Sequence, residues 1–216
     1  MSDISRREML RNAALGSIGL GLFGTSAAAA AKSESILAKL IAGTPAKAKS
    51  MIGVPFEKHQ TVRMAFIGTG LRGRSVIGEF VNVPGVQVVA LNDVVKEKAD
   101  QAKAIVEKAN AGKPEIYVNG DYGYRDLLKR DDIDVVYIAT PWEWHVPQAV
   151  DAMKSGKHAC TEVPAGYTLQ DIWKIVDTSE ATRKHCMLME NCCYGWGELF
   201  ALNLVRSGVL GTIVHG

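Results

Sequence analysis

Three glycines and one aspartate have the residue types and the spacing of a diphosphate site. Gly68, Gly70 and Gly73 form a G-x-G-x-x-G pattern, and Asp93 follows 20 residues after the last glycine. The first glycine permits a tight turn, the second lets backbone N–H groups approach an anion, and the third lets a helix pack close to the preceding strand. A carboxylate at Asp93 can accept hydrogen bonds from a ribose diol. The pattern therefore predicts a dinucleotide site.

The elements on either side of the glycines are those that such a site requires. Residues 62–67 and 86–91 are short apolar runs that predict buried parallel strands, and a helix can begin at Leu71 between them. The helix N-terminus then faces the bound anion. Because an acid at residue 93 repels a 2′-phosphate, the sequence favours NAD over NADP. Arg72 and Arg74 weaken this preference, since either can neutralise a phosphate.

The remaining sequence alternates strands and helices, which predicts a doubly wound α/β fold with a parallel sheet. Thr168 and Asp171 predict a capping box for one of the helices, whose inward stripe we expect at Leu169, Ile172, Trp173 and Val176. The expected helices are 96–110, 124–130, a segment after His145, one from Leu169, and 196–207. The expected strands are 116–118, 134–139, one ending at Thr161, 186–189, and one beginning at 212–216.

Composition describes an ordinary globular protein. The 216 residues are 47% hydrophobic and 22% charged, with a net charge of +2, which indicates neither disorder nor a nucleic-acid partner. Cys192 and Cys193 are adjacent and cannot pair without strain, so we expect no disulfide framework. With Cys160 and Cys186 there are four cysteines in the chain, and their spacing is not that of zinc ligands. We interpret all four cysteines as small core residues and expect no metal.

Residues 1–31 have the pattern of a cleaved twin-arginine signal peptide. Arg6 and Arg7 precede an uncharged, glycine-rich apolar run at 13–23, and the alanine tract at 27–31 supplies A-x-A cleavage sites. The alternative is a short membrane anchor, but the run is too short and too rich in glycine to span a bilayer comfortably. We therefore expect export to the periplasm or secretion. The twin-arginine route carries folded proteins, which suits a protein that takes up a nucleotide before export.

The chain divides into segments of different character. Residues 32–60 are expected to form a linker, 61–190 the dinucleotide-binding domain, and 191–216 the start of a second, α+β substrate domain. Because the second domain barely begins, we expect the chain to be truncated.

Several longer strings resemble a known family. The fingerprint, Ile138-Ala-Thr-Pro141 with His145, and Gly156-Lys-His158 before Glu162-x-Pro164 resemble the glucose–fructose oxidoreductase, inositol dehydrogenase and MocA (Gfo/Idh/MocA) superfamily. Within it, the sequence looks like glycoside hydrolase family 109. The strings that carry this second likeness are Trp142-Glu-Trp-His145, Glu162-Val-Pro-Ala165, Asp177-Thr-Ser-Glu180, Thr182-Arg-Lys-His-Cys186 and Glu190-Asn-Cys-Cys-Tyr194.

This resemblance implies NAD-dependent hydrolysis of α-N-acetylgalactosaminides, with a small-molecule glycoside as substrate. It implies a scheme in which sugar C3 is oxidised transiently, the anomeric group is eliminated, water adds and the ketone is reduced again. The resemblance also implies that most catalytic groups lie beyond Gly216, so catalytic residues stay unassigned, although Tyr194 is a candidate sugar contact whose alternative is a core aromatic. The implied cofactor contacts, besides the glycines, are Leu71, Arg72, Asp93, Trp142, Glu143, Trp144, His145, Glu162, Val163 and Asn191.

Alternatives remain for individual residues and for the function. His145 binds the cofactor or simply bonds to backbone, and Glu162 binds the nicotinamide ribose or caps a turn. The superfamily's dehydrogenases usually carry a lysine where this chain has Val163, and a valine cannot transfer a proton. That favours the hydrolase. An exported NAD(P)-dependent sugar oxidoreductase and an inactive nucleotide-binding fragment stay open, as does a homo-oligomer.

Overall fold

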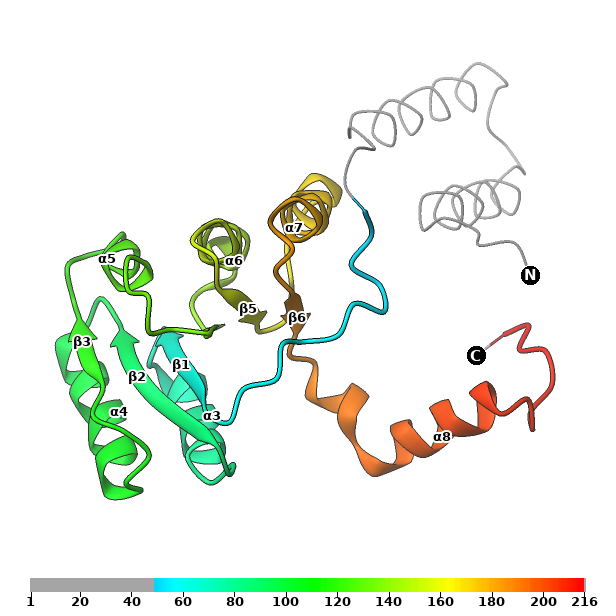
Figure 1. Cartoon of the computed structure of the whole chain (residues 1–216), viewed down its shortest axis with the longest axis horizontal. Helices are drawn as coiled ribbons and strands as arrows, with labels where there is room; N and C mark the ends of the chain where they lie inside the picture. The colour runs from blue at the N-terminus through cyan, green and yellow to red at the C-terminus, as the bar shows by residue number, and fades with distance from the viewer. Residues whose placement is uncertain (1–48, 216) are drawn as a thin grey trace, which may run out of the picture. The chain divides into compact units, whose positions relative to one another are not determined.

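A computed structural model describes residues 49–215 of the chain (Figure 1). The predicted signal peptide at 1–31 and the first part of the predicted linker lie outside these residues. Within 49–215, no helix combines the length and the apolar composition needed to cross a membrane. The compact unit that begins at Lys49 contains the predicted nucleotide site.

The core of this unit is a parallel sheet of six strands, which confirms the predicted fold class. The strands lie in the order β3-β2-β1-β4-β5-β6, and every neighbouring pair is parallel. The chain order therefore reverses between β1 and β4, as in doubly wound sheets. The strands are β1 (Val62–Ile67), β2 (Val86–Asn92), β3 (Glu115–Tyr117), β4 (Val135–Ile138), β5 (His158–Thr161) and β6 (Cys186–Leu188).

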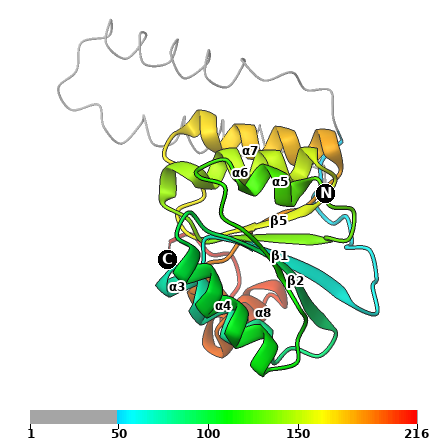
Figure 2. The same ribbon diagram turned by 90° about the vertical axis from the view of Figure 1, so that its left-hand side faces the viewer.

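Helices cover both faces of the sheet (Figure 2). One layer contains α3 (Leu71–Phe80) and α4 (Lys96–Lys108), and the other contains α5 (Tyr124–Leu128), α6 (His145–Lys154) and α7 (Leu169–Thr182). Two short 3-10 turns, Trp142–Trp144 and Asn191–Tyr194, follow β4 and β6, and α8 (Trp196–Arg206) comes last.

Alternation along the strands divides the apolar side chains between the two layers. On β1, Phe66 belongs to the cluster under α3 and α4, whereas its neighbour Ile67 belongs to the cluster under α5 to α7. On β4, Tyr137 and Ile138 divide in the same way. Because successive side chains of a strand point to opposite faces, an apolar run buried on both faces is what a central parallel strand requires.

The sequence prediction for α7 is right about its start and only partly right about its buried face. Thr168 and Asp171 form the expected capping box. Of the predicted inward stripe, Leu169 and Ile172 are exposed, whereas Trp173 and Val176 are half-buried. The side chains that α7 buries fully are Ile175, Thr178 and Ser179. The helix covers the end of the sheet and packs against α6, so only a narrow stripe becomes buried.

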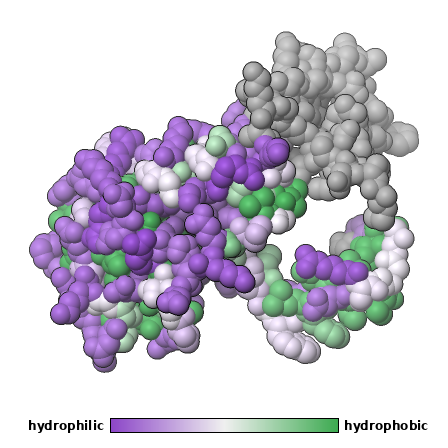
Figure 3. Space-filling model, viewed as in Figure 1, coloured by the Kyte–Doolittle hydropathy of each residue, from purple (hydrophilic) through white to green (hydrophobic). Residues whose placement is uncertain are grey.

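Two further expectations are corrected at the end of the chain. Residues 212–215 form no strand. Cys192 and Cys193 are exposed and are not core residues, whereas Cys160 and Cys186 pack against the two apolar clusters. Helix α8 has no buried residue, and Trp196 at its start is 81% exposed. Hydrophobic residues are visible on the surface of this segment (Figure 3).

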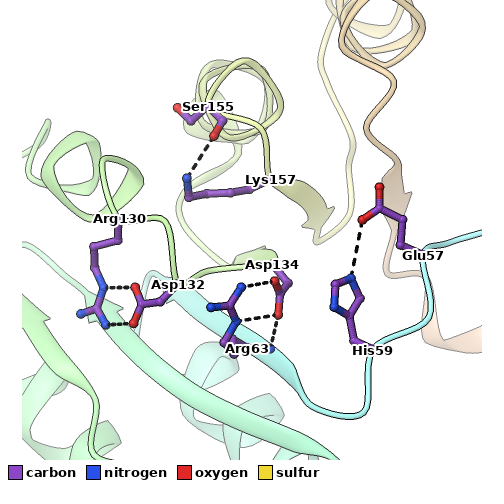
Figure 4. Close-up of polar contacts among 8 residues, drawn as sticks. All are labelled: Glu57, His59, Arg63, Arg130, Asp132, Asp134, Ser155 and Lys157. Atoms are coloured by element: carbon purple, nitrogen blue, oxygen red, sulfur yellow. Dashed lines mark hydrogen bonds and ion pairs between the residues drawn. The ribbon is translucent and has the colours of Figure 1, made fainter.

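Ion pairs fix the edge of the sheet at which the strands begin (Figure 4). The guanidinium of Arg63 contacts both carboxylate oxygens of Asp134, at 3.0 Å through Nε and 2.6 Å through Nη2. This bond lowers the pKa of Asp134. Arg130 makes a similar two-point contact with Asp132. The start of β1 is thereby tied to the start of β4, at the edge opposite the strand ends that carry the predicted site.

Candidate nucleotide-binding site

The residues predicted to bind a nucleotide follow the carboxyl ends of different strands. Gly68 comes after β1, Asp93 after β2, the loop of residues 142–145 after β4, Glu162 after β5 and Asn191 after β6. In a parallel sheet these ends lie along one edge, and ligands bind there at the point where strand order reverses. Here the reversal lies between β1 and β4, so the glycine turn occupies that point.

The glycine turn packs tightly against β4. Gly68 has a φ of +87°, and a Cβ placed on it would lie 2.6 Å from the carbonyl oxygen of Ala139. A Cβ on Gly73 would collide with the Gly68 carbonyl oxygen. Both positions therefore require glycine for reasons internal to the fold: a left-handed backbone at the first, and a close approach of α3 to the turn at the second.

Gly70 differs from its two neighbours in the motif. A Cβ built on it meets no atom within 4 Å, its chain neighbours aside, and its φ of −64° suits any residue. It is also the N-cap of α3, and no side chain caps the helix there. Open space in front of uncapped helix N–H groups is the arrangement that accepts a diphosphate. The fold thus does not require glycine at residue 70, but a closely approaching anion would.

Asp93 holds the glycine turn in place. Its Oδ2 accepts the Thr69 N–H at 2.7 Å and the Thr69 hydroxyl at 3.0 Å, while Oδ1 accepts the Val95 N–H at 2.9 Å. Thr69 is fully buried. A carboxylate oxygen can accept more than one hydrogen bond, so Oδ1 retains capacity for a ribose hydroxyl. The sequence reasoning had given Asp93 only the ribose role and missed its structural one.

Glu162 lies across the site from Asp93 and has two partners of its own. Its Oε1 accepts the Arg72 Nε–H at 2.6 Å and the Tyr137 hydroxyl at 2.5 Å. The bond to Glu162 raises the pKa of Arg72. Burial, and then the hydrogen bond to Glu162, raise the pKa of Tyr137. The contact joins the first turn of α3 to the end of β5, so the two predicted cofactor residues Arg72 and Glu162 are in direct contact.

The two arginines that weakened the expectation of NAD over NADP both have protein partners. Arg72 is paired with Glu162, and Arg74 donates from Nη1 to the Thr69 carbonyl oxygen at 2.8 Å. A 2′-phosphate would have to compete with these contacts while facing the carboxylate of Asp93. The geometry thus strengthens the preference that Asp93 alone suggested.

The loop after β4 supplies four predicted cofactor contacts, which differ in exposure. Trp142 and Glu143 are exposed, and the Trp142 ring lies 6.1 Å from that of Tyr167. Trp144 is half-buried and packs edge-on against Tyr122 at 5.4 Å. Trp142 is therefore the indole that a ligand can reach, whereas Trp144 anchors the loop to the core.

His145 is buried, and both its ring nitrogens face carbonyl oxygens. Nδ1 lies 2.7 Å from the Pro164 oxygen and Nε2 2.9 Å from the Thr140 oxygen. The ring thus joins the loop after β4 to the loop after β5. Of the two roles left open for His145, hydrogen bonding to the backbone is the one that its ring nitrogens have. A contact with a cofactor would have to use other atoms of His145.

The remaining predicted cofactor contacts, Leu71, Val163 and Asn191, are exposed. Tyr194 is also exposed, so it is not a core aromatic, and its hydroxyl donates to the Leu188 carbonyl oxygen at 3.1 Å. Partial burial raises the pKa of Tyr194, so its hydroxyl remains protonated at neutral pH. Among residues 49–215, no group of three or more histidines, cysteines or acids is placed to hold a metal.

Sequence reasoning missed Thr69 and Tyr137. Thr69 is the variable residue between the first two glycines, and nothing in the motif marks it. Tyr137 lies within an apolar run and was interpreted only as part of a buried strand. One signal was available, because a buried tyrosine hydroxyl usually needs a hydrogen-bond partner.

Comparison with known proteins agrees with this geometry. Residues 62–191 match the GFO_IDH_MocA family model, described as an oxidoreductase family with an NAD-binding Rossmann fold. The whole chain is 44% identical to a glycosyl hydrolase family 109 protein of Shewanella sp. (strain W3-18-1). It is equally similar to an α-N-acetylgalactosaminidase of Shewanella oneidensis. The chain spans about half the length of these curated relatives, 46% in both cases.

A solved structure gives the same result for the fold. Myo-inositol dehydrogenase from Lactobacillus casei, in complex with NAD(H) and myo-inositol, superposes with a TM-score of 0.61 and 27% identity. The match covers 70% of this chain and 43% of that one. The expected cofactor, NAD, is thereby supported by the fold as well as by the open glycine turn. The chain belongs to the Gfo/Idh/MocA oxidoreductase family, whose members share an NAD-binding Rossmann fold.

Proposed function

We propose that this chain is the cofactor-binding part of an NAD-dependent glycoside hydrolase of the α-N-acetylgalactosaminidase type. The observation that carries NAD binding is the open approach to Gly70 at the uncapped start of α3, between the carboxylates of Asp93 and Glu162. The hydrolase assignment is supported by 44% identity, along the whole chain, to proteins named glycosyl hydrolase family 109.

The residues of the site have separable roles in this proposal. The α3 N-terminus and the amide groups near Gly70 receive the diphosphate, and Asp93 receives a hydroxyl of the adenosine ribose. Glu162 receives a hydroxyl of the second ribose, and the exposed Trp142 borders the site. When bound, NAD supplies reversible oxidation at sugar C3, which acidifies the C2 proton and lets the anomeric group leave before water adds and the ketone is reduced again.

Val163 argues against a dehydrogenase that relies on a lysine at this position. It is exposed immediately after Glu162, and its side chain has no group that can hold or transfer a proton. A dehydrogenase that relies on a lysine at this position would lack its proton acceptor here. Oxidation at sugar C3 releases the hydroxyl proton as well as the hydride, so both the competing oxidoreductase and the proposed hydrolase need a proton acceptor other than residue 163. Among residues 49–215, none is assigned that role.

One assay separates the two enzymes. A glycosidase of this type releases the aglycone from an aryl α-N-acetylgalactosaminide without accumulating NADH, whereas an oxidoreductase reduces added NAD in proportion to its product. The assay is run on the 216-residue chain and on any longer product encoded downstream of Gly216. For the 216-residue chain itself we expect NAD binding without glycoside cleavage. NADH formed in proportion to product would reject the hydrolase.

We also propose that the protein is exported by the twin-arginine pathway. The support is the Arg6-Arg7 pair ahead of a short apolar run. Replacing both arginines by lysine should leave the unprocessed protein in the cytoplasm, whereas the unmodified chain should be recovered outside it in a shorter form. Equal export of the two proteins would reject this route.

A further inference from the structure

Tyr137 is a buried residue with a polar hydroxyl group, and the proposed cofactor site assigns it no role. It is 1% exposed, and its ring is fixed between those of Phe66, stacked at 5.3 Å, and Phe80, edge-on at 5.7 Å. The hydroxyl, at the far end of this fixed ring, is directed at Glu162. A side chain packed in this way cannot change rotamer without disturbing the core, so its hydroxyl is held in one place.

The register of the sheet explains why Tyr137 and Glu162 meet. Tyr137 pairs with Cys160 across β4 and β5. Because side chains alternate along a strand, the residue two positions beyond Cys160, which is Glu162, points to the same face. The carboxylate therefore emerges above the tyrosine ring at the end of the sheet. It is 8% exposed, which places it at the boundary between the core and the predicted site.

The two partners of Glu162 differ in how firmly they are held. Arg72 is on the first turn of α3 and its side chain is 45% exposed, so its guanidinium can move to a nearby anion. Tyr137 cannot move in this way. Both partners use Oε1, so among the described residues Oε2 receives neither of these bonds. If Arg72 turned toward a bound diphosphate, the tyrosine would still hold the carboxylate in place.

We propose that Tyr137 is a positioning residue of the cofactor site: its hydroxyl fixes Glu162 so that Oε2 accepts a hydroxyl of the second ribose of the bound dinucleotide. This inference rests on the proposed NAD-binding function. The raised pKa of Tyr137 keeps the hydroxyl protonated, and hence a donor, throughout the neutral range.

The test compares ligands that differ by the second ribose. ADP contains the adenosine half and the diphosphate, whereas ADP-ribose adds the ribose that Glu162 would contact. Calorimetry on the 216-residue chain should show that Tyr137→Phe weakens ADP-ribose about tenfold, the size expected for a misplaced charge-assisted hydrogen bond, and leaves ADP unchanged. Phenylalanine retains the ring stacking, so the fold should persist.

Tyr124→Phe is the matched control. Tyr124 is also fully buried and also donates its hydroxyl to a carboxylate, Oδ2 of Asp151 at 2.8 Å, but on the other face of the sheet. Its loss should change neither affinity. A purely structural role for Tyr137 predicts instead that its variant weakens ADP and ADP-ribose alike, and that outcome would overturn the inference, as would wild-type affinity for both ligands.

A second variant makes the test independent of how well Tyr137→Phe folds. If Tyr137 acts through Glu162, Glu162→Ala should show at least the same loss of ADP-ribose affinity relative to ADP affinity, because Arg72, released from Glu162, would act on the diphosphate of both ligands alike. Adding Tyr137→Phe to Glu162→Ala should cause no further loss. A wild-type ratio of ADP-ribose to ADP affinity in Glu162→Ala would overturn the inference. Failure of the wild-type chain to bind NAD, ADP and ADP-ribose would instead reject the proposed function itself.

Discussion

The carboxylate of Asp93 accepts two hydrogen bonds from Thr69, one from its backbone N–H at 2.7 Å and one from its hydroxyl at 3.0 Å. The residue that ends the second strand therefore fixes the turn that ends the first. Because this turn presents the start of α3, a single carboxylate organises the predicted binding sites for the diphosphate and for the ribose. Loss of NAD binding in an Asp93 variant would thus have two causes.

Asp93→Ala should lower the free energy of unfolding by about 2–3 kcal/mol, because it leaves the buried Thr69 N–H without its acceptor. Urea denaturation measures this change. Asp100→Ala is a suitable control, since Asp100 forms only an exposed pair with Lys96 on α4, and its removal should cost less than about 0.5 kcal/mol. Equal effects of the two substitutions would show that the Asp93 contacts do not stabilise the turn.

Substitution of the glycines should separate folding from binding. Gly70→Ala places its Cβ in open space, so it should change the free energy of unfolding by less than about 1 kcal/mol while abolishing NAD binding. Gly68→Ala should cost more than about 2 kcal/mol, because it combines a left-handed backbone with a collision at Ala139. Calorimetry with NAD and thermal unfolding give the two readouts. Normal NAD affinity in Gly70→Ala would place the diphosphate elsewhere.

NAD should bind at least about tenfold more tightly than NADP, because the 2′-phosphate would face Asp93 while Arg72 and Arg74 are engaged with Glu162 and Thr69. Competition calorimetry with the two nucleotides measures the ratio. If the affinities were equal, Arg74 would have to leave Thr69 for the phosphate. Arg74→Ala would then weaken NADP selectively, a result that contradicts the expectation.

Stability should decrease as the pH falls below about 6.5, partly because of His158. Its Nδ1 accepts the His185 N–H at 3.0 Å, which requires the neutral ring. Burial, and then the charges of Lys184 and His185, lower the pKa of His158, so the unfolded chain binds a proton more readily. The contribution is complete above the unfolded pKa and is lost as the pH falls through the lower, folded one.

Thermal unfolding between pH 7.5 and 5 checks this prediction. His158→Asn retains an oxygen that can accept the same N–H but does not titrate, so its stability should vary less with pH. His59→Asn is the control, because His59 is paired loosely with Glu57 at 3.7 Å (Figure 4) and its replacement should keep most of the slope. An unchanged slope in His158→Asn would remove His158 as a source of the pH dependence.

The sequence by itself determined the architecture and the position of the site. Glycines 68, 70 and 73 between two apolar runs, with an acid after the second, predict the first β-α-β unit, because each local preference agrees with the same fold. The alternation of elements then fixes a parallel sheet, and with it the edge at which residues 93, 145 and 162 gather. The sequence prediction failed in part for the buried face of α7, and it failed for the strand expected at residues 212–215. In both places the outcome depends on which neighbouring elements cover the segment.

Only the tertiary structure decided how the site is held together. The contacts of Asp93 with Thr69, of Tyr137 with Glu162 and of His145 with Pro164 join residues 19 to 25 positions apart. They depend on strand register and on the height at which each strand ends, which a local pattern does not encode. The sequence therefore predicts which acids face the nucleotide, and the packing of neighbouring strands decides which oxygen of each acid remains for it.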